Sequence, residues 1–167
     1  PSSTGVIGVP LPVEKLEATI ATISLPLPEI VSMEPFARAI MTTDTRPKTI
    51  SFKIGKAVLT GVAKGAGMIE PNMATMLAYF FTDAKIESTL LKKMLLKVTE
   101  KTFNCLSIDT DMSTSDTALV LANGLAGKVN LKEFEQKFYD AALYLAREIA
   151  RDGEGATKLF TVTVSEA

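Results

Sequence analysis

Two stretches of the chain repeat apolar residues at helical spacing and predict its longest helices. In the first, an apolar residue recurs at every fourth position, namely Ile86, Leu90, Met94 and Val98. In the second, a similar spacing joins Phe134, Phe138, Ala141, Leu145 and Ile149. Such a stripe faces a core while polar residues cover the opposite side, so we expect two amphipathic helices packed on one core.

Shorter segments rich in apolar, β-branched and aromatic residues predict strands. These are Thr49–Ile54, Ala57–Ala63, Ala74–Phe81, Thr117–Ala122 and Thr157–Val164. The dipeptide Gly55-Lys56 separates the first two, and two residues containing glycine are typical of a tight hairpin. We therefore expect the first two strands to pair directly.

The N-terminal part predicts two shorter helices, over Val13–Ile23 and around Pro35–Met41. Pro12 precedes the first of them and suits a first helical turn. Pro26 and Pro28 follow it and end the helix, because proline cannot continue the hydrogen-bond ladder.

This order of elements predicts an α+β fold of mixed layers. Strands and helices alternate irregularly and include a hairpin, which argues against a doubly wound parallel sheet. At 167 residues with 47% hydrophobic residues, the chain can bury a core and fits one domain over residues 1–167.

Charge and cysteine content exclude several classes of protein. A net charge of −1 gives no electrostatic reason to expect nucleic acid or an anionic membrane as partner. No apolar run is long enough to span a bilayer. The single cysteine, Cys105, cannot form an internal disulfide, which favours a reducing compartment and a cytoplasmic location.

The chain contains no histidine. A Ser-His-Asp or Cys-His arrangement within it is therefore excluded, as is a histidine-ligated metal site. If the chain carries out covalent chemistry alone, its base must be another group. The amine of an N-terminal threonine is one known solution.

The segment Lys64–Ala78 is the strongest candidate for such chemistry. Its glycine pair, Gly65-Ala66-Gly67, leads into the turn Pro71-Asn72 and then into an apolar run that contains Thr75. A hydroxyl at the start of a buried strand, beside backbone that permits close approach, suits a nucleophile. The alternative is a hairpin or bulge followed by an ordinary strand threonine.

The same glycine pair is a weak signal for a nucleotide. It lacks the third glycine of a dinucleotide fingerprint, and no Lys-Ser or Lys-Thr follows it as in a P-loop. A nucleotide-binding module is therefore disfavoured.

Several carboxylates sit in loops. Asp109, Asp111 and Asp116 do not have EF-hand spacing, and caps or turns explain them better than a cation site. Glu154 lies between Gly153 and Gly155, where it is either a solvated loop carboxylate or is held facing a site.

The dipeptide Thr4-Gly5 offers a hydroxyl beside a backbone N–H in a loop of small residues. Both groups could point at one developing negative charge, as in an oxyanion hole. The alternative is a simple turn.

Four segments together resemble the ornithine acetyltransferase family of arginine biosynthesis, also called glutamate N-acetyltransferases. They are Ser3–Gly8, Thr42–Lys48, Lys64–Leu77 and Ala150–Lys158. The resemblance spans essentially the whole chain in the right order, and the Lys64–Leu77 motif is highly specific. It implies a mixed sheet flanked by helices, similar to but distinct from the N-terminal nucleophile hydrolases.

The resemblance implies a precursor that cleaves itself at an Ala-Thr bond, here Ala74–Thr75. An α chain would end at Ala74 and a β chain would begin at Thr75, and family members usually assemble as heterotetramers of two of each. The freed Thr75 amine would serve as base for its own hydroxyl, which fits the absence of histidine.

The implied reaction is acetyl transfer in two half-reactions. The Thr75 hydroxyl would take the acetyl group of N-acetylornithine as an ester, and glutamate would then accept it, giving ping-pong kinetics. The Thr4 hydroxyl and the Gly5 N–H would form the oxyanion hole. No cofactor or metal is expected, although some members also accept acetyl-CoA as donor.

Four positions align with substrate-binding residues of the family, namely Thr43, Lys64, Thr75 and Glu154. The Lys64 ammonium suits an α-carboxylate, and the Glu154 carboxylate suits an amino group of ornithine or glutamate. We expect Thr43 rather than Thr42 to take the threonine role.

The chain also departs from the family. Members are considerably longer, and their C-terminal portion supplies further substrate-binding residues. Two alternatives therefore stay open, a relative that hydrolyses amides or peptides from an N-terminal threonine, and a catalytically silent structural fragment. Cleavage at Ala74–Thr75 would distinguish an N-terminal nucleophile from a purely structural domain.

Overall fold

The computed structural model describes residues 2, 4, 8–24, 32–70, 76–111, 113 and 115–165. Its elements follow the order α1 (Val13–Ala21), α2 (Glu34–Ala39), β1 (Lys48–Ile54), β2 (Ala57–Lys64), β3 (Leu77–Ala84), α3 (Ser88–Glu100), a short 3₁₀ turn (Phe103–Cys105), β4 (Thr117–Gly127) and α4 (Leu131–Arg151).

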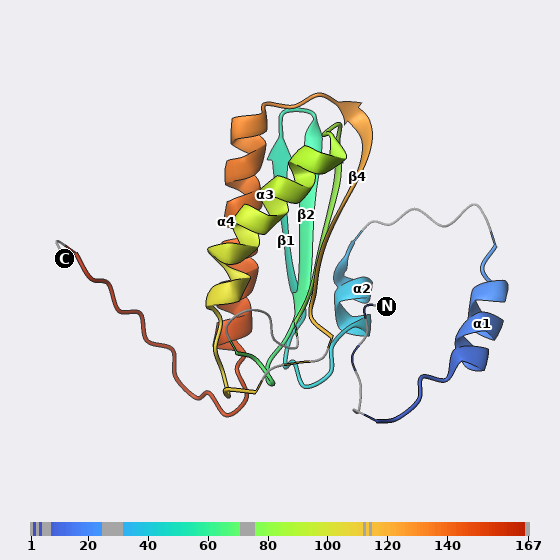
Figure 1. The fold of residues 1–167 in the computed structure, drawn as a ribbon, viewed down its shortest axis with the longest axis vertical. Coiled ribbons are helices and arrows are strands. Elements are labelled where there is room, and N and C mark those ends of the chain that lie inside the picture. Colours follow the sequence, from blue (N-terminus) through green and yellow to red (C-terminus); the bar gives the residue numbers. More distant parts are fainter. Residues whose placement is uncertain are drawn as a thin grey trace.

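The strands form one mixed sheet in the order β1-β2-β3-β4 (Figure 1). The first three strands run antiparallel to one another, whereas β4 runs parallel to β3. A parallel neighbour needs a crossover, and α3 lies in the connection between β3 and β4. The α+β prediction of a mixed sheet with helices is confirmed.

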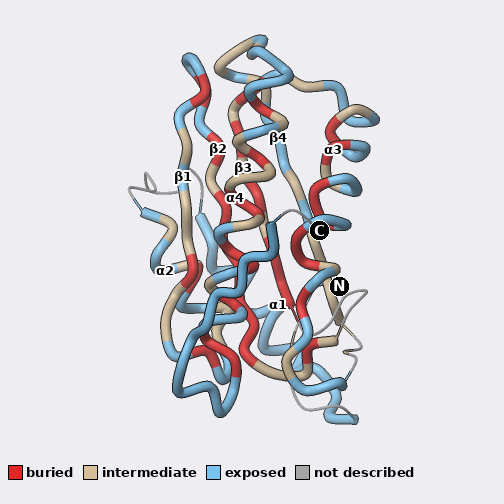
Figure 2. The backbone as a smooth tube through the Cα atoms, turned by 90° about the vertical axis from the view of Figure 1, so that its left-hand side faces the viewer, coloured by how far each residue is buried: buried red, intermediate tan, exposed pale blue. Residues whose placement is uncertain are grey.

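The two long helices cover one face of this sheet and enclose the core (Figure 1). Four large residues of α4 are fully buried, namely Phe134, Phe138, Leu145 and Ile149. Phe80 of β3 meets Phe138 edge to face, with 4.8 Å between ring centroids. In α3, buried positions alternate with exposed ones, as Figure 2 shows along the tube. The apolar stripes seen in the sequence thus become the core faces of both helices.

The opposite face of the sheet is covered in part by α2. Phe36 of α2 packs edge to face on Tyr79, with ring centroids 5.4 Å apart, and reaches Phe81 at 6.0 Å. The Ser2 hydroxyl lies 2.6 Å from the Tyr79 hydroxyl, so the N-terminal segment approaches the same face. Elsewhere on this face Leu121 of β4 remains exposed.

Most of the predicted elements are confirmed. The hairpin turns at Gly55, whose φ of +59° is the left-handed conformation that glycine adopts freely. Helix α1 forms where expected but buries none of its residues, and Figure 1 shows it apart from the sheet. Pro26 and Pro28 lie outside the described residues.

Two strands, β3 and β4, differ from their predicted bounds by more than one residue. Within the described residues β3 begins at Leu77 rather than at Ala74 and continues to Ala84, and β4 extends beyond Ala122 to Gly127. Ala74 itself is outside the described residues. In the part of the chain that the structure describes, no helix is long and apolar enough to cross a membrane.

The predicted strand over Thr157–Val164 is wrong. Residues 156–165 form neither helix nor strand, and the side chains of Phe160, Val162 and Val164 are exposed. An alternating pattern gives a segment two different faces, but a strand also needs a neighbour for its backbone hydrogen bonds. None of the four described strands pairs with this segment.

Gly61 tests how closely α4 packs on the sheet. A Cβ at this position would lie 2.8 Å from Phe80 Cε1 and 2.9 Å from Leu145 Cδ1. Gly61→Ala should therefore lower the free energy of unfolding by about 1–3 kcal/mol, because the core must shift to admit the methyl group. Urea unfolding measures the change.

The control is Lys53→Gln, an exposed position on the neighbouring strand β1, which we expect to change stability by less than about 0.5 kcal/mol. Equal stability of Gly61→Ala and the wild type would show that the helix and the sheet are less closely packed than the structure shows.

Candidate functional site

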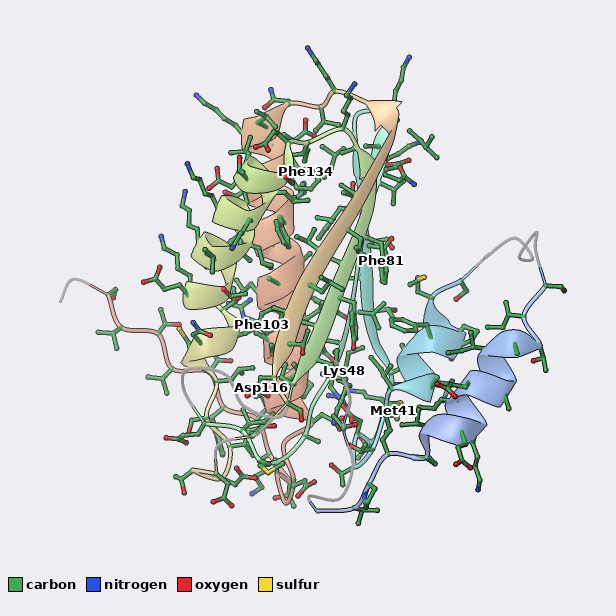
Figure 3. All side chains as sticks on the ribbon, turned by 45° about the vertical axis from the view of Figure 1, so that its right-hand side comes forward. Met41, Lys48, Phe81, Phe103, Asp116 and Phe134 are labelled. Atoms are coloured by element: carbon green, nitrogen blue, oxygen red, sulfur yellow. The ribbon has the colours of Figure 1, made fainter. Side chains whose placement is uncertain are left out.

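Three of the predicted site residues, Thr43, Lys64 and Glu154, lie at one end of the sheet. Register pairs Lys48 at the start of β1 with Ala63 near the end of β2, and Lys64 with Leu77 at the start of β3. The start of β4 lies beside that of β3, and the C-terminal end of α4 reaches the same place through Asp152. Figure 3 shows Lys48 and Asp116 at this end, far from Phe134.

Lys64, the last residue of β2, is buried at this end. Its Nζ donates to Thr42 Oγ1 at 2.8 Å, and no ion pair of Lys64 occurs among the described residues. Burial lowers the pKa of Lys64, while the nearby carboxylates Asp44, Glu154 and Asp116 oppose that shift. An ammonium carries three donors, and among the described residues only one of the three on Lys64 has a hydrogen-bond partner.

Glu154 rests on the glycine loop that follows Lys64. Its backbone N–H donates to the carbonyl oxygen of Ala66 at 2.7 Å. A Cβ at Gly67 would lie 2.6 Å from the carboxyl carbon of Glu154. Glycine at position 67 is thus what lets this carboxylate lie directly against the backbone. The side chain is exposed to solvent and lies against the backbone of the loop at Gly67.

A buried lysine joins the segments around these residues. The side chain of Lys48 has no exposed surface, and its Nζ lies 2.6 Å from both Asp44 Oδ1 and Asp152 Oδ2. Asp44 Oδ1 also accepts the Gly65 N–H at 2.7 Å, and Asp152 Oδ2 accepts the Thr45 N–H at 3.0 Å. None of these three charged residues was predicted from the sequence as a site residue.

The ionised forms of both aspartates are favoured in the folded chain. Burial disfavours the charge on Asp44, but hydrogen bonds from Lys48, Gly65 and Thr42 outweigh it and lower the pKa of Asp44. Burial likewise opposes the charge on Asp152, and hydrogen bonds from Lys48 and Thr45 lower its pKa. Both carboxylates are therefore charged partners of Lys48 at neutral pH.

Asp109 holds the far side of the glycine loop. Its carboxylate accepts the backbone N–H groups of Met68 and of Ile69, the latter at 2.9 Å. It also forms the predicted local turn by accepting the Asp111 N–H at 3.3 Å. A turn was expected here, whereas the contact with a loop 40 residues earlier was not. No group of three or more candidate metal ligands occurs in the described part of the chain.

Asp116 holds the chain where β3 begins. Its Oδ1 accepts the Met76 N–H at 2.9 Å, and the next residue, Thr117, donates its N–H to the Met76 carbonyl oxygen at 3.1 Å. Burial raises the pKa of Asp116 against the opposing hydrogen bond from Met76. Both backbone polar groups of Met76, the residue after Thr75, are thus fixed by the start of β4.

Three of the predicted catalytic and cleavage residues, Gly5, Ala74 and Thr75, lie outside the described residues. Thr4 is half-buried. Ser2 contacts Tyr79 of β3, which brings the N-terminal segment to the strand that follows Thr75 in sequence.

The two adjacent threonines before β1 differ in their contacts. Both side chains are exposed, but within the described residues only that of Thr42 accepts a hydrogen bond from Lys64. The choice of Thr43 over Thr42 stays a prediction. The Thr42 hydroxyl nevertheless lies beside the Lys64 ammonium, at 2.8 Å.

The pairing of Asp44 predicts a pH-dependent loss of stability on substitution. Because the pKa of Asp44 is lower in the folded chain than its ordinary value of 3.8, the charged carboxyl stabilises the fold above about pH 4. This contribution disappears as the pH falls through the lowered pKa. Asp44→Asn should cost about 1–3 kcal/mol at pH 7, and the cost should shrink below about pH 4.

Urea unfolding of both proteins between pH 7 and pH 3 measures this difference. Glu17→Gln on the exposed helix α1 serves as the control and should match the wild type throughout. A cost of Asp44→Asn that stays constant across this range would contradict the assignment.

Comparisons with known proteins identify the family of this chain. A family model described as the ArgJ family matches residues 1–167. The arginine biosynthesis bifunctional protein ArgJ 2 of Clostridium acetobutylicum is 54% identical over 164 residues, which is 98% of this chain and 42% of the relative.

Two further relatives have similar coverage. The glutamate N-acetyltransferase Oat2 of Streptomyces clavuligerus is 50% identical over 99% of this chain and 42% of its own length. The ArgJ protein of Thermus thermophilus is 52% identical over 98% of this chain and 42% of its own length. The chain thus spans about two fifths of the curated relatives it matches. Since the family match covers the whole chain and these relatives are about half identical to it, the chain belongs to the ArgJ family.

Proposed function

We propose that the protein carrying this chain transfers an acetyl group from N-acetylornithine to glutamate in arginine biosynthesis. The observation that carries the proposal is the placement of opposite charges on one glycine loop, with the Lys64 ammonium at its start and the Glu154 carboxylate resting on Gly67. An amino acid presents a carboxylate and an ammonium group, so these two side chains suit its two ends. The names of the relatives support the same reaction class.

In the proposed mechanism, cleavage of the Ala74–Thr75 bond frees the Thr75 amine. This amine takes the proton of the Thr75 hydroxyl as the oxygen attacks the acetyl carbonyl, and the Thr4 hydroxyl and Gly5 N–H donate to the oxyanion. The amide C–N bond then breaks, ornithine leaves with the proton, and an acetyl-Thr75 ester remains. The amino group of glutamate then attacks the ester carbonyl and the C–O bond to Thr75 breaks. A proton of the attacking amine passes through the Thr75 amine to the Thr75 oxygen, so N-acetylglutamate leaves and Thr75 is restored.

Several further features belong to this proposal. The reaction needs no metal or cofactor, and acetyl-CoA could enter the first half-reaction in place of N-acetylornithine. The α and β chains produced by cleavage would assemble as a heterotetramer in the cytoplasm. Asp116 and Thr117 hydrogen-bond both backbone polar groups of Met76. This fixes the position of the chain directly after the proposed nucleophile.

Thr75→Ala tests the nucleophile. The wild-type protein should give two polypeptides that meet at Ala74/Thr75 and should gain one acetyl group when mixed with N-acetylornithine alone. Thr75→Ala should stay one polypeptide and gain none, because it lacks the attacking hydroxyl. Intact mass spectrometry under denaturing conditions measures both properties.

The wild type should then lose the acetyl group on addition of glutamate. An uncut wild-type chain without acetylation would contradict the mechanism. Rapid loss of the acetyl group to water without glutamate would instead identify a hydrolase that uses the same nucleophile.

Gly67→Ala tests the role of Glu154. The three atoms nearest to the new methyl group would all belong to the flexible end of the Glu154 side chain, so the carboxylate must move while the fold can remain stable. We expect KM for glutamate to rise roughly tenfold, equivalent to about 1.4 kcal/mol, with a change in stability below about 0.5 kcal/mol.

The double variant Gly67→Ala, Glu154→Asp shortens the acidic side chain by one methylene and makes room for the methyl group. Its loss of affinity for glutamate should be smaller than the sum of the losses measured for Glu154→Asp and for Gly67→Ala alone. Steady-state kinetics with glutamate provide the four values of this cycle. An unchanged KM for glutamate in Gly67→Ala would show that Glu154 does not bind this substrate.

A further inference from the structure

The end of the sheet that carries Lys64 and Glu154, here called the site end, also contains a pair of buried ion pairs between Lys48 and two aspartates. None of these three residues has been given a substrate role. Lys48 is completely enclosed, with its Nζ 2.6 Å from carboxylate oxygens of Asp44 and Asp152. A charge in that position cannot reach a ligand in solution. Its contacts, however, lead to the segments that carry Thr43, Lys64 and Glu154.

Asp44 links Lys48 to two of these segments. Its Oδ1 accepts the N–H of Gly65, the residue that follows Lys64, at 2.7 Å. Its Oδ2 accepts the Thr42 N–H at 3.3 Å, and Thr42 in turn accepts the hydrogen bond from the Lys64 ammonium. The position of Asp44 therefore determines where the Lys64 ammonium and the adjoining threonines lie.

Asp152 links Lys48 to the third segment. It ends α4 two residues before Glu154, and it accepts the backbone N–H and the hydroxyl of Thr45. The ion pair with Lys48 thus ties the end of α4 to the loop before β1. From there the chain continues to Glu154, whose N–H donates to the Ala66 carbonyl oxygen and whose carboxylate lies beside Gly67.

The charges of this cluster also affect Lys64. The charge of Asp44 stabilises the Lys64 ammonium and that of Lys48 destabilises it, so the three groups interact electrostatically. In the described residues Asp44 pairs with Lys48 and not with Lys64. Without Lys48, Asp44 would become an unpaired anion beside Lys64 and would compete with a ligand carboxylate for its ammonium.

We propose that Lys48 is a positioning residue of the substrate site. By holding Asp44 and Asp152 on its two sides, it fixes the separation of Lys64 and Glu154 and leaves the Lys64 ammonium available for a substrate carboxylate. This inference rests on the proposed function, because it takes Lys64 and Glu154 as the groups that bind the amino acid.

The test compares Lys48→Met and Asp152→Asn with a control that weakens the fold elsewhere. Lys48→Met removes the ammonium, whereas Asp152→Asn leaves Lys48 paired with Asp44 and is the milder change. Leu145→Ala, in the core on α4, is the matched control for lost stability. All variants are made in the complete protein that carries this chain.

The measurements are kcat and KM for glutamate and for N-acetylornithine, together with glutamate binding by calorimetry. We expect KM and Kd for glutamate to rise about tenfold in Lys48→Met and about threefold in Asp152→Asn, with smaller changes in kcat. Leu145→Ala should stay within about twofold of the wild type in KM. If Lys48→Met does not fold, Asp152→Asn decides the comparison.

Glutamate affinity in Asp152→Asn equal to that in Leu145→Ala would overturn the positioning role. So would a fall in kcat alone with KM unchanged. Failure of the proposed function looks different, because the wild type itself would then neither cleave at Thr75 nor become acetylated. In that case the calorimetric comparison still decides the inference, and a wild type that binds no glutamate would overturn both.

Discussion

The placement of a fully buried ammonium between two carboxylates governs the site end of this fold. Removing charges from water costs several kcal/mol for each ion, which only close pairing and additional hydrogen bonds can offset. Lys48 meets two carboxylates at 2.6 Å, and backbone N–H groups of Gly65 and Thr45 satisfy further lone pairs on them. The interaction is directional, so it defines distances between loops that apolar packing alone would leave loosely determined.

The rest of the molecule is organised around this polar end by α4. Along most of its length the helix presents apolar residues such as Phe138 and Ile149 to the sheet, which fixes its position but tolerates small rotations. At its last turn Asp152 replaces apolar contact with an ion pair to Lys48. One helix therefore both builds the core and sets the place from which Glu154 reaches the glycine loop.

Local patterns in the sequence were enough to predict the helices and the hairpin, because helical period and the turn at Gly55 are properties of neighbouring residues. The strand expected at Thr157–Val164 failed because its pattern specifies two faces but no partner strand. Lys48 was missed because lysine is ordinarily exposed. Asp44, four residues earlier, is a weak hint, and Asp152 lies 104 residues later where no local pattern could connect it. The residues alone left a simple turn as the alternative for Thr4 and a solvated loop carboxylate as the alternative for Glu154. The family resemblance gave these two residues and Lys64 their roles in the site.

The antiparallel pairing of β2 with β3 has a consequence for the proposed cleavage. The Ala74–Thr75 bond lies in the connection between these two strands, whose ladder runs from Leu59 and Thr82 to Lys64 and Leu77. After a cut there, both products would still share a single sheet and a single core. They could part only by global unfolding, and reassembly would then require two molecules to meet. Cleavage would thus make folding effectively irreversible. The lifetime of the cut protein would depend on its slow unfolding rate and not on an equilibrium between its two polypeptides.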